Sequence, residues 1–243
     1  MSFHDVLLGA GLAFAATSLG ALGVLLFKHI NCRNYAPILT FSGGVMAFSI
    51  FEMFNESHAL VGNSAFIGLI IGILAFTLVE HLLPHVHILI RRKKLQDSKK
   101  KAVLLAGTMA LHNIPEGFAI ASAFAASPAL GWLVTTSIAI QDVPEGLVAS
   151  APLACCGVSQ KRSIFWGVFS GFAEFVAAIF GFIFLSIIGT LVPFALSFSA
   201  GAMAYVVVFE LLPDALKGPM RNLSAITFIF GIVFAVVLAS FFA

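Results

Sequence analysis

Two six-residue blocks near the middle of the chain combine side chains that bind divalent metal ions. Residues 112–117 read HNIPEG, and residues 141–146 read QDVPEG. In each block the first and fifth residues are four apart, so they share one face of a helix. Imidazole, carboxylate and amide groups together suit a borderline ion such as Zn²⁺ or a related first-row metal. The blocks therefore predict a metal site built from two helices.

The elements that carry these blocks are expected to cross a membrane. Of the 243 residues, 60% are hydrophobic and only 10% are charged, and the mean hydropathy is +1.06. A soluble domain is nearer to one half apolar and one quarter charged. The composition predicts an all-α polytopic membrane protein. No basic patch with interleaved aromatic residues indicates a nucleic-acid partner.

Eight apolar segments are long enough to span a bilayer, which takes about 20 residues per helix. We expect them to form one transmembrane domain over residues 1–243. The spans are predicted at about residues 5–28, 36–55, 64–90, 102–126, 129–153, 163–189, 191–213 and 222–242. The run RRKKLQDSKKK at residues 91–101 is expected to be a solvated basic loop.

The basic residues indicate the orientation of these spans. All 13 Lys and Arg residues fall in alternate connections, those after the first, third, fifth and seventh spans. Positive residues near membrane ends mark the cytoplasmic side. A wrong helix count would have scattered them over both faces. The pattern therefore predicts eight spans with both termini outside and a cytoplasmic loop at 91–101.

Four acids are expected near the middle of the bilayer. His112 lies 11 residues beyond Lys101, and Glu174 lies 12 residues beyond Arg162. At 1.5 Å per residue both lie about 16–18 Å deep, near the midplane of a core about 30 Å thick. On insertion scales four such acids cost about 10–14 kcal/mol. No Lys or Arg is within reach, so protons, a bound cation or both must neutralise them. The acids are Glu116, Asp142, Glu145 and Glu174.

Two adjacent metal sites can be drawn from these side chains, because two of the acids can bridge. The first would use His112, Glu116, Gln141 and Glu145. The second would use Asn113, Glu116, Asp142, Glu145 and Glu174. The alternative is a static bundle in which the acids are protonated and hydrogen-bonded to one another.

Two internal repeats relate helices that run in opposite directions. Leu111–Phe124 and Ile140–Leu153 align on Pro-Glu-Gly, and FSGGVMAF at 41–48 resembles FSAGAMAY at 198–205. Inverted repeats with interrupted helices that meet at the midplane are typical of transporters. The small residues of the second pair also favour close helix packing, which is the structural alternative.

Each of the two blocks also contains a proline and a glycine. Pro115 and Pro144 lack an N–H and are expected to kink their helices. Gly117 and Gly146 are expected to allow close approach of another backbone. Irregular backbone at this depth is tolerated where it lines a cavity, so these residues favour a transport pathway.

At these residues the chain resembles the ZIP (Zrt/Irt-like) family of divalent-metal transporters, in its compact bacterial form. The resemblance covers the eight spans, the basic loop and the paired PEG motifs. It implies a binuclear site, with Met46 contacting metal from the facing side or serving only as a packing methionine. The implied ligands are His112, Asn113, Glu116, Gln141, Asp142, Glu145 and Glu174. Many members have histidine where Gln141 stands, so this neutral ligand makes a broader metal range plausible.

The resemblance also implies how the protein works and where. Spans one, four, five and six would form a mobile bundle that slides past a scaffold of spans two, three, seven and eight. The scaffold would also provide a homodimer contact. The expected substrates are zinc, and also iron, manganese, cadmium or cobalt, carried into the cytoplasm across the plasma (bacterial inner) membrane. No bound cofactor is expected, because the metal is the cargo, and no enzyme activity is expected.

Three further polar groups and three rival functions remain open on the sequence. Metal entrance or exit sites could lie at the ends of spans two, three and seven, or these could be ordinary wet helix ends. The rival functions are a cation or proton channel, a metal exporter, and an intramembrane metal-dependent hydrolase. The last is disfavoured because only one histidine is central. The polar groups are Glu52, Glu56 and His58; His81, His85 and His87; and Glu210 and Asp214.

Overall fold

The computed structural model describes residues 2–25, 36–82, 98–155, 157–216 and 219–241, and this part of the chain is helical and contains no strand. The helices are α1 (Phe3–Leu22), α2 (Ala36–Val61), α3 (Ala65–Leu82), α5 (Ser98–Ala126), α6 (Pro128–Cys155), α7 (Gln160–Ile187), α8 (Val192–Tyr205), α9 (Leu212–Leu216) and α10 (Arg221–Ala239). Short 3₁₀ turns follow α1, α2 and α7. A six-residue π-helix, Val206–Leu211, joins α8 to α9.

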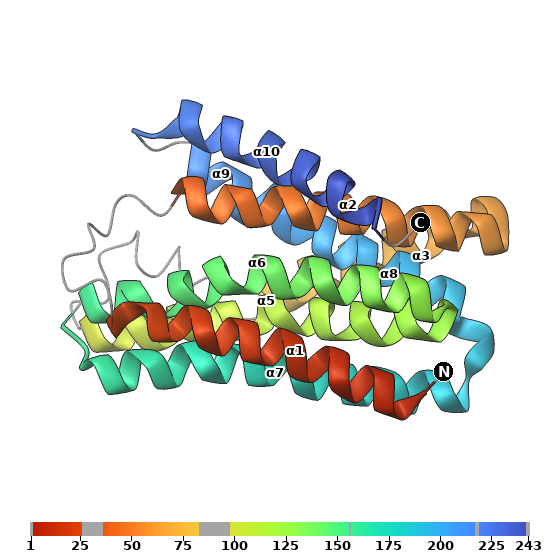
Figure 1. The fold of residues 1–243 in the computed structure, drawn as a ribbon, viewed down its shortest axis with the longest axis horizontal. Helices are drawn as coiled ribbons and strands as arrows, with labels where there is room; N and C mark the ends of the chain where they lie inside the picture. The colour runs from red at the N-terminus through yellow and green to blue at the C-terminus, as the bar shows by residue number, and fades with distance from the viewer. Residues whose placement is uncertain (1, 26–35, 83–97, 156, 217–218, 242–243) are drawn as a thin grey trace.

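The long helices lie side by side in two layers (Figure 1). One layer contains α1, α5, α6 and α7, in which α5 packs on α7 and α1 packs on both α6 and α7. The other contains α2, α3, α8, α9 and α10, in which α2 packs on α10 and α3 on α8. We call them the site layer and the outer layer. They meet mainly where α2 contacts α6 and where α5 contacts α8.

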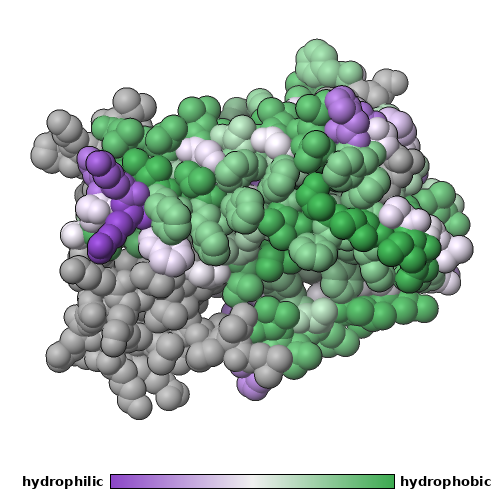
Figure 2. All heavy atoms as spheres, turned by 90° about the horizontal axis from the view of Figure 1, so that it is seen from below, coloured by the Kyte–Doolittle hydropathy of each residue, from purple (hydrophilic) through white to green (hydrophobic). Residues whose placement is uncertain are grey.

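Five stretches of the described chain are long and apolar enough to cross a membrane: Phe3–Leu25, Ala36–His81, Gln160–Ile187, Gly189–Leu211 and Arg221–Ala239. Their outward side chains are large and apolar; Leu19 is 63% exposed and Ile187 is 75% exposed. Figure 2 shows this hydrophobic surface as a broad green expanse across one face. A water-soluble surface would not expose so many. The protein is therefore an integral membrane protein, whereas the predicted count of eight crossings stays a prediction.

The helices α5 and α6 do not belong to these five stretches, although each has nearly 30 residues. Both carry one of the two polar blocks, and α5 also begins with the lysine run at 99–101. Both run without a break through their internal prolines, Pro115 in α5 and Pro144 in α6. The site thus lowers the hydropathy of the very helices that hold it.

Several boundaries differ from those predicted. The second span was expected to end at 55, but α2 continues to Val61 and stops where Gly62 adopts a left-handed φ of 58°. Polar residues at a wet helix end do not by themselves stop a helix. The basic loop was expected to reach residue 101, but α5 already begins at Ser98, because Lys is a good helix former. The rest of that loop lies outside the described residues, and so do His85 and His87 of the predicted third span.

The start of α1 and the end of α10 lie at the same end of the bundle (Figure 1). The helices α5, α7 and α10 all begin at the opposite end. Lys161 and Arg162 lie in the first turn of α7, and Arg221 is the first residue of α10. This arrangement agrees with the alternation of basic residues in the sequence.

Close helix packing depends on glycines that come in symmetric pairs. A Cβ built on Gly117 would overlap the backbone of α7, and a Cβ built on Gly146 would overlap that of α1. In the outer layer, Gly44 lies in the same way against α10, and Gly201 lies against α3. The expectation of close backbone approach at the PEG glycines is confirmed. Both sequence repeats therefore correspond to equivalent helix–helix contacts.

Candidate metal site

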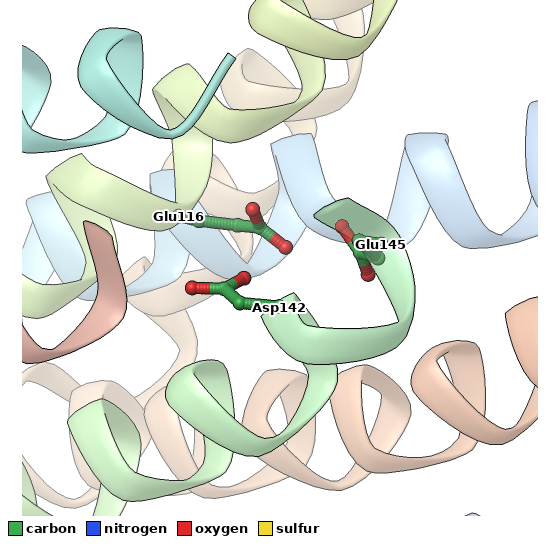
Figure 3. Close-up of side chains that lie close together, drawn as sticks. All are labelled: Glu116, Asp142 and Glu145. Carbon is green, nitrogen blue, oxygen red and sulfur yellow. The ribbon is translucent and has the colours of Figure 1, made fainter. Parts of the chain in front are cut away.

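Three carboxyl groups meet between α5 and α6. One oxygen each of Glu116, Asp142 and Glu145 can be chosen so that all three lie within 4.8 Å of one another, and all three residues are buried. Figure 3 shows the three side chains directed toward a common space, with Glu116 coming from α5 and the other two from α6. The two six-residue blocks predicted that these acids lie close together, and the structure brings them together.

Gln141 fixes one of these carboxylates. Its side-chain Nε2 donates to Oε1 of Glu116 at 2.6 Å. The side-chain oxygen of Gln141 has no hydrogen-bond partner among the described residues. The backbone at this point is held from the outer layer, because the Ser42 hydroxyl on α2 donates to the main-chain carbonyl of Gln141 at 3.1 Å. The carbonyl that Pro144 leaves without its helical donor is that of the preceding residue, Ile140.

Two side chains from flanking helices complete the surroundings. The Glu174 carboxyl group on α7 lies within interaction range of Glu116, Asp142 and Glu145. The Thr17 hydroxyl on α1 lies within interaction range of Asp142. Glu174 was predicted from its depth, whereas Thr17 was missed. Its only signal in the sequence is that it is a polar residue in an apolar span.

Most oxygen atoms of the site have no hydrogen-bond partner among the described residues. The six side chains involved are at most 3% exposed. The eight atoms without a partner are Asn113 Oδ1, Glu116 Oε2, Gln141 Oε1, Asp142 Oδ1 and Oδ2, Glu145 Oε1, and Glu174 Oε1 and Oε2. Buried polar atoms are normally hydrogen-bonded, and exceptions point to a strained or ligand-binding site. The oxygens without partners favour a ligand-binding site over a static bundle in which every acid is hydrogen-bonded.

The charges of this cluster repel one another. Two ionised carboxylates 4.8 Å apart repel by about 3.5 kcal/mol at an effective dielectric constant of about 20. Three ionised carboxylates would repel by about 10 kcal/mol, before the cost of removing them from water. A divalent cation between them turns this repulsion into attraction. Carboxylate and amide oxygens are ligands for Zn²⁺, Mn²⁺ and related ions.

His112 contacts the π-helix that joins α8 to α9. Its Nε2 lies 2.7 Å from Oε2 of Glu210, and the two side chains are 13% and 11% exposed. Glu210 belongs to the π-helix Val206–Leu211, where the helix register shifts by one residue. Such π-segments are frequent at functional sites. The ring remains near enough to Glu116 to interact with its charge. The structure thus links the site layer to the outer layer through this pair.

The remaining predicted site residues lie apart from the carboxylates or at the ends of helices. Met46 is buried in the main apolar cluster with Met203, its counterpart in the sequence repeat. In the C-terminal part of α2, Glu52 and Glu56 are half-buried, and His58 lies 3.4 Å from the Asn63 side chain. Near the C-terminal end of α3, His81 is exposed. No three of these helix-end residues form a cluster of ligand atoms within the described chain.

The outer layer contains one more buried polar pair that the sequence did not indicate. The Tyr205 hydroxyl, at the end of α8, donates to Glu80 near the end of α3. Tyr205 also stacks on Phe209 within the π-helix, with ring centroids 4.8 Å apart. The pair therefore anchors the segment that carries Glu210.

Comparison with known proteins identifies the family to which this site belongs. The family model described as "ZIP Zinc transporter" matches residues 91–239. The chain is 34% identical to "Zinc transporter GufA" of Myxococcus xanthus over 249 residues, which cover 95% of this chain and 98% of that protein. It is 35% identical to "Zinc transporter ZupT" of Salmonella paratyphi A over 216 residues, which cover 84% of each chain. The chain belongs to the ZIP family of divalent-metal transporters.

Proposed function

We propose that this protein moves divalent metal ions into the cytoplasm through the buried site between α5 and α6. The observation that carries the proposal is the set of eight buried oxygen atoms without hydrogen-bond partners. They include oxygens of the three carboxylates that lie within 4.8 Å of one another. The protein around them exposes a largely apolar surface, as a membrane protein does. Family membership and the names of the relatives support metal as the cargo.

We assign the ligands to two adjacent positions bridged by Glu116 and Glu145. The first position adds His112 and Gln141. The second adds Asn113, Asp142 and Glu174. His112 would leave Glu210 to reach the first position. Met46, which is packed in the apolar cluster on α2, would contact the metal from the facing layer.

The donor atoms favour a broad range of divalent metals. All eight atoms without partners are carboxylate or amide oxygens. Among the proposed ligands, His112 supplies the one imidazole. Oxygen-rich sites accommodate Mn²⁺ and Fe²⁺ as well as Zn²⁺, whereas imidazole and thiolate favour Zn²⁺. The names of the relatives support zinc as the main cargo. The oxygen donors support iron, manganese, cobalt and cadmium as weaker competitors.

The two-layer arrangement supports sliding of the site layer past the outer layer. Few polar contacts join the layers among the described residues. They are Ser42 with the Gln141 carbonyl, Ser122 with Ser199 at 3.5 Å, and His112 with Glu210. All side chains of the proposed metal site, apart from Met46, come from the site layer. Movement of that layer as one body would carry the metal with its ligands.

The charge distribution supports eight crossings with the termini outside. The first turns of α5, α7 and α10 carry basic residues at one end of the bundle, which we assign to the cytoplasm. The bacterial relatives support a bacterial inner membrane. We further propose a homodimer formed through the outer layer, where α10 exposes Ile226, Ile229 and Phe230.

Flux of radioactive zinc into proteoliposomes tests the proposal. Wild type should take up Zn²⁺ with saturation, and Glu145→Gln and His112→Ala should reduce uptake strongly. Glu56→Gln, at the outer end of α2, is the matched carboxylate control. Unchanged flux in both site variants would contradict the assignment, and flux without saturation would indicate a channel. A panel of competing metals in the same assay measures selectivity.

A further inference from the structure

The glycine contacts define which residues of the two halves are equivalent. A Cβ on Gly117 would overlap the carbonyl oxygen of Glu174 and lie 2.9 Å from the backbone nitrogen one turn further along α7. A Cβ on Gly146 would overlap the carbonyl oxygen of Thr17 and lie 3.0 Å from the backbone nitrogen one turn further along α1. Because the two glycines occupy the same place in the PEG repeat, Thr17 is the counterpart of Glu174.

Thr17 is buried in the wall of the site. Its side chain is 1% exposed, and its hydroxyl donates to the Ala13 carbonyl at 3.1 Å. The neighbouring helix makes room for it at Gly171, where a Cβ would lie 2.8 Å from the Thr17 Cβ and 3.0 Å from Oγ1. Its hydroxyl lies within interaction range of the Asp142 carboxyl group.

At each of two equivalent positions, one half of the site has a carboxylate and the other half has a neutral polar residue. In the half built from α5 and α7, the two positions hold Asn113 and Glu174. In the half built from α6 and α1, the equivalent positions hold Asp142 and Thr17. Each half therefore has one carboxylate and one neutral polar group at this level. A carboxylate at position 17 would add a fifth acid to a cluster that already repels itself.

We propose that Thr17 is a positioning residue of the metal site, which orients the Asp142 carboxylate and keeps this half of the site neutral at position 17. The proposal rests on the function proposed above. A hydroxyl has one donor and two acceptor positions, so its proton can turn from Ala13 to Asp142 when that carboxylate binds metal. Both Asp142 oxygens lack a hydrogen-bond partner among the described residues, so either oxygen could accept a hydrogen bond from the Thr17 hydroxyl.

Thr17→Val and Thr17→Ser separate the hydroxyl from the shape of the side chain. Valine keeps the branched shape without the hydroxyl, and serine keeps the hydroxyl. Thr135→Val is the matched control, because Thr135 is fully buried on α6 against Gly9 of α1, in the same helix pair. Thr17→Ala replaces Thr17→Val if the latter does not fold, as judged by its amount in the membrane and its melting curve.

The measurements are the Zn²⁺ dissociation constant of the purified protein, by competition with a chelating dye, and the half-saturation and maximal rate of flux. Removal of groups that orient metal ligands typically weakens binding about 10–100-fold. We expect a loss of that size in Thr17→Val, a half-saturation raised in parallel, and a melting temperature close to wild type. Thr17→Ser and Thr135→Val should stay within about threefold of wild type.

Two results would overturn the inference: wild-type affinity in Thr17→Val, or an equal loss in Thr17→Ser or Thr135→Val. The second would show that α1–α6 packing, and not the hydroxyl, is what matters. Failure of the proposed function gives a different pattern. In that case wild type itself binds no Zn²⁺, or Glu145→Gln binds it as well as wild type.

Discussion

Replacement of Glu145 by glutamine should have opposite effects on the metal-free protein and on metal binding. Glutamine keeps the size of the side chain and removes its charge. In the absence of metal, Glu145→Gln removes two of the three carboxylate pairs within 4.8 Å. At about 3.5 kcal/mol per ionised pair, this relieves about 7 kcal/mol of repulsion when all three acids are ionised. Proton uptake by the acids already relieves part of it, so the metal-free variant should melt a few degrees higher than wild type.

In the presence of metal the same substitution should be harmful, because Glu145 bridges both proposed positions. Loss of a direct ligand exceeds the effect of losing an outer one, so we expect Zn²⁺ binding to weaken by more than about 100-fold. Zn²⁺ at 100 times its dissociation constant should raise the free energy of unfolding of wild type by about 2.7 kcal/mol. The melting temperature of wild type should rise accordingly. In Glu145→Gln that rise should be lost.

Melting of detergent-solubilised protein, with and without Zn²⁺, measures both effects in one experiment. Glu56→Gln is the control, since Glu56 is a half-buried acid outside the cluster. If the metal-free variant were less stable than wild type and still showed the full rise with Zn²⁺, the acids would belong to a hydrogen-bonded framework. The reasoning from charge repulsion would then be refuted.

Three further predictions follow from the packing and the chemistry. Gly117→Ala would place a Cβ on the Glu174 carbonyl and should destabilise by about 3 kcal/mol or more, whereas Gly11→Ala, with nothing within 4 Å, should be neutral or stabilise by about 0.5–1 kcal/mol; equal melting temperatures would contradict the close packing. Gln141→His adds an imidazole and should raise the preference for Zn²⁺ over Mn²⁺ in flux competition by about tenfold, or about 1.4 kcal/mol; an unchanged ratio would place Gln141 outside the coordination shell. His112→Ala and Glu210→Gln should combine non-additively in flux, with a coupling of about 0.5–3 kcal/mol, and additive losses would show that their 2.7 Å contact has no role in transport.

The carboxylate cluster was predictable because its signals are local and repeated. The i, i+4 spacing within each PEG block places Glu116 and Glu145 on defined helix faces, and the repeat places the two blocks at one depth. The basic residues at alternate connections gave the same depth for Glu174. The cost of burying charge in lipid then required these acids to share a site.

Other features depend on packing that one sequence does not display. The π-helix Val206–Leu211 turns Glu210 toward His112, and a register shift of one residue leaves no mark in composition. Thr17 lies in a span whose other residues near the site are apolar or small, and only the glycine contacts with α6 and α7 reveal its place. The extension of α2 to Val61 was missed because polar residues were taken as its end, while Gly62 is the actual stop.

Anomalous X-ray scattering from crystals grown with Zn²⁺ is the most direct test that the buried oxygens form the transport site. The account predicts an anomalous peak among Glu116, Asp142 and Glu145, with oxygen atoms of these carboxylates about 2.0–2.2 Å from the ion. Glu145→Gln crystals grown in the same way should lose that peak or show it much weakened. Peaks confined to helix-end residues such as His58 or His81, with none between α5 and α6 in the wild type, would contradict the central claim.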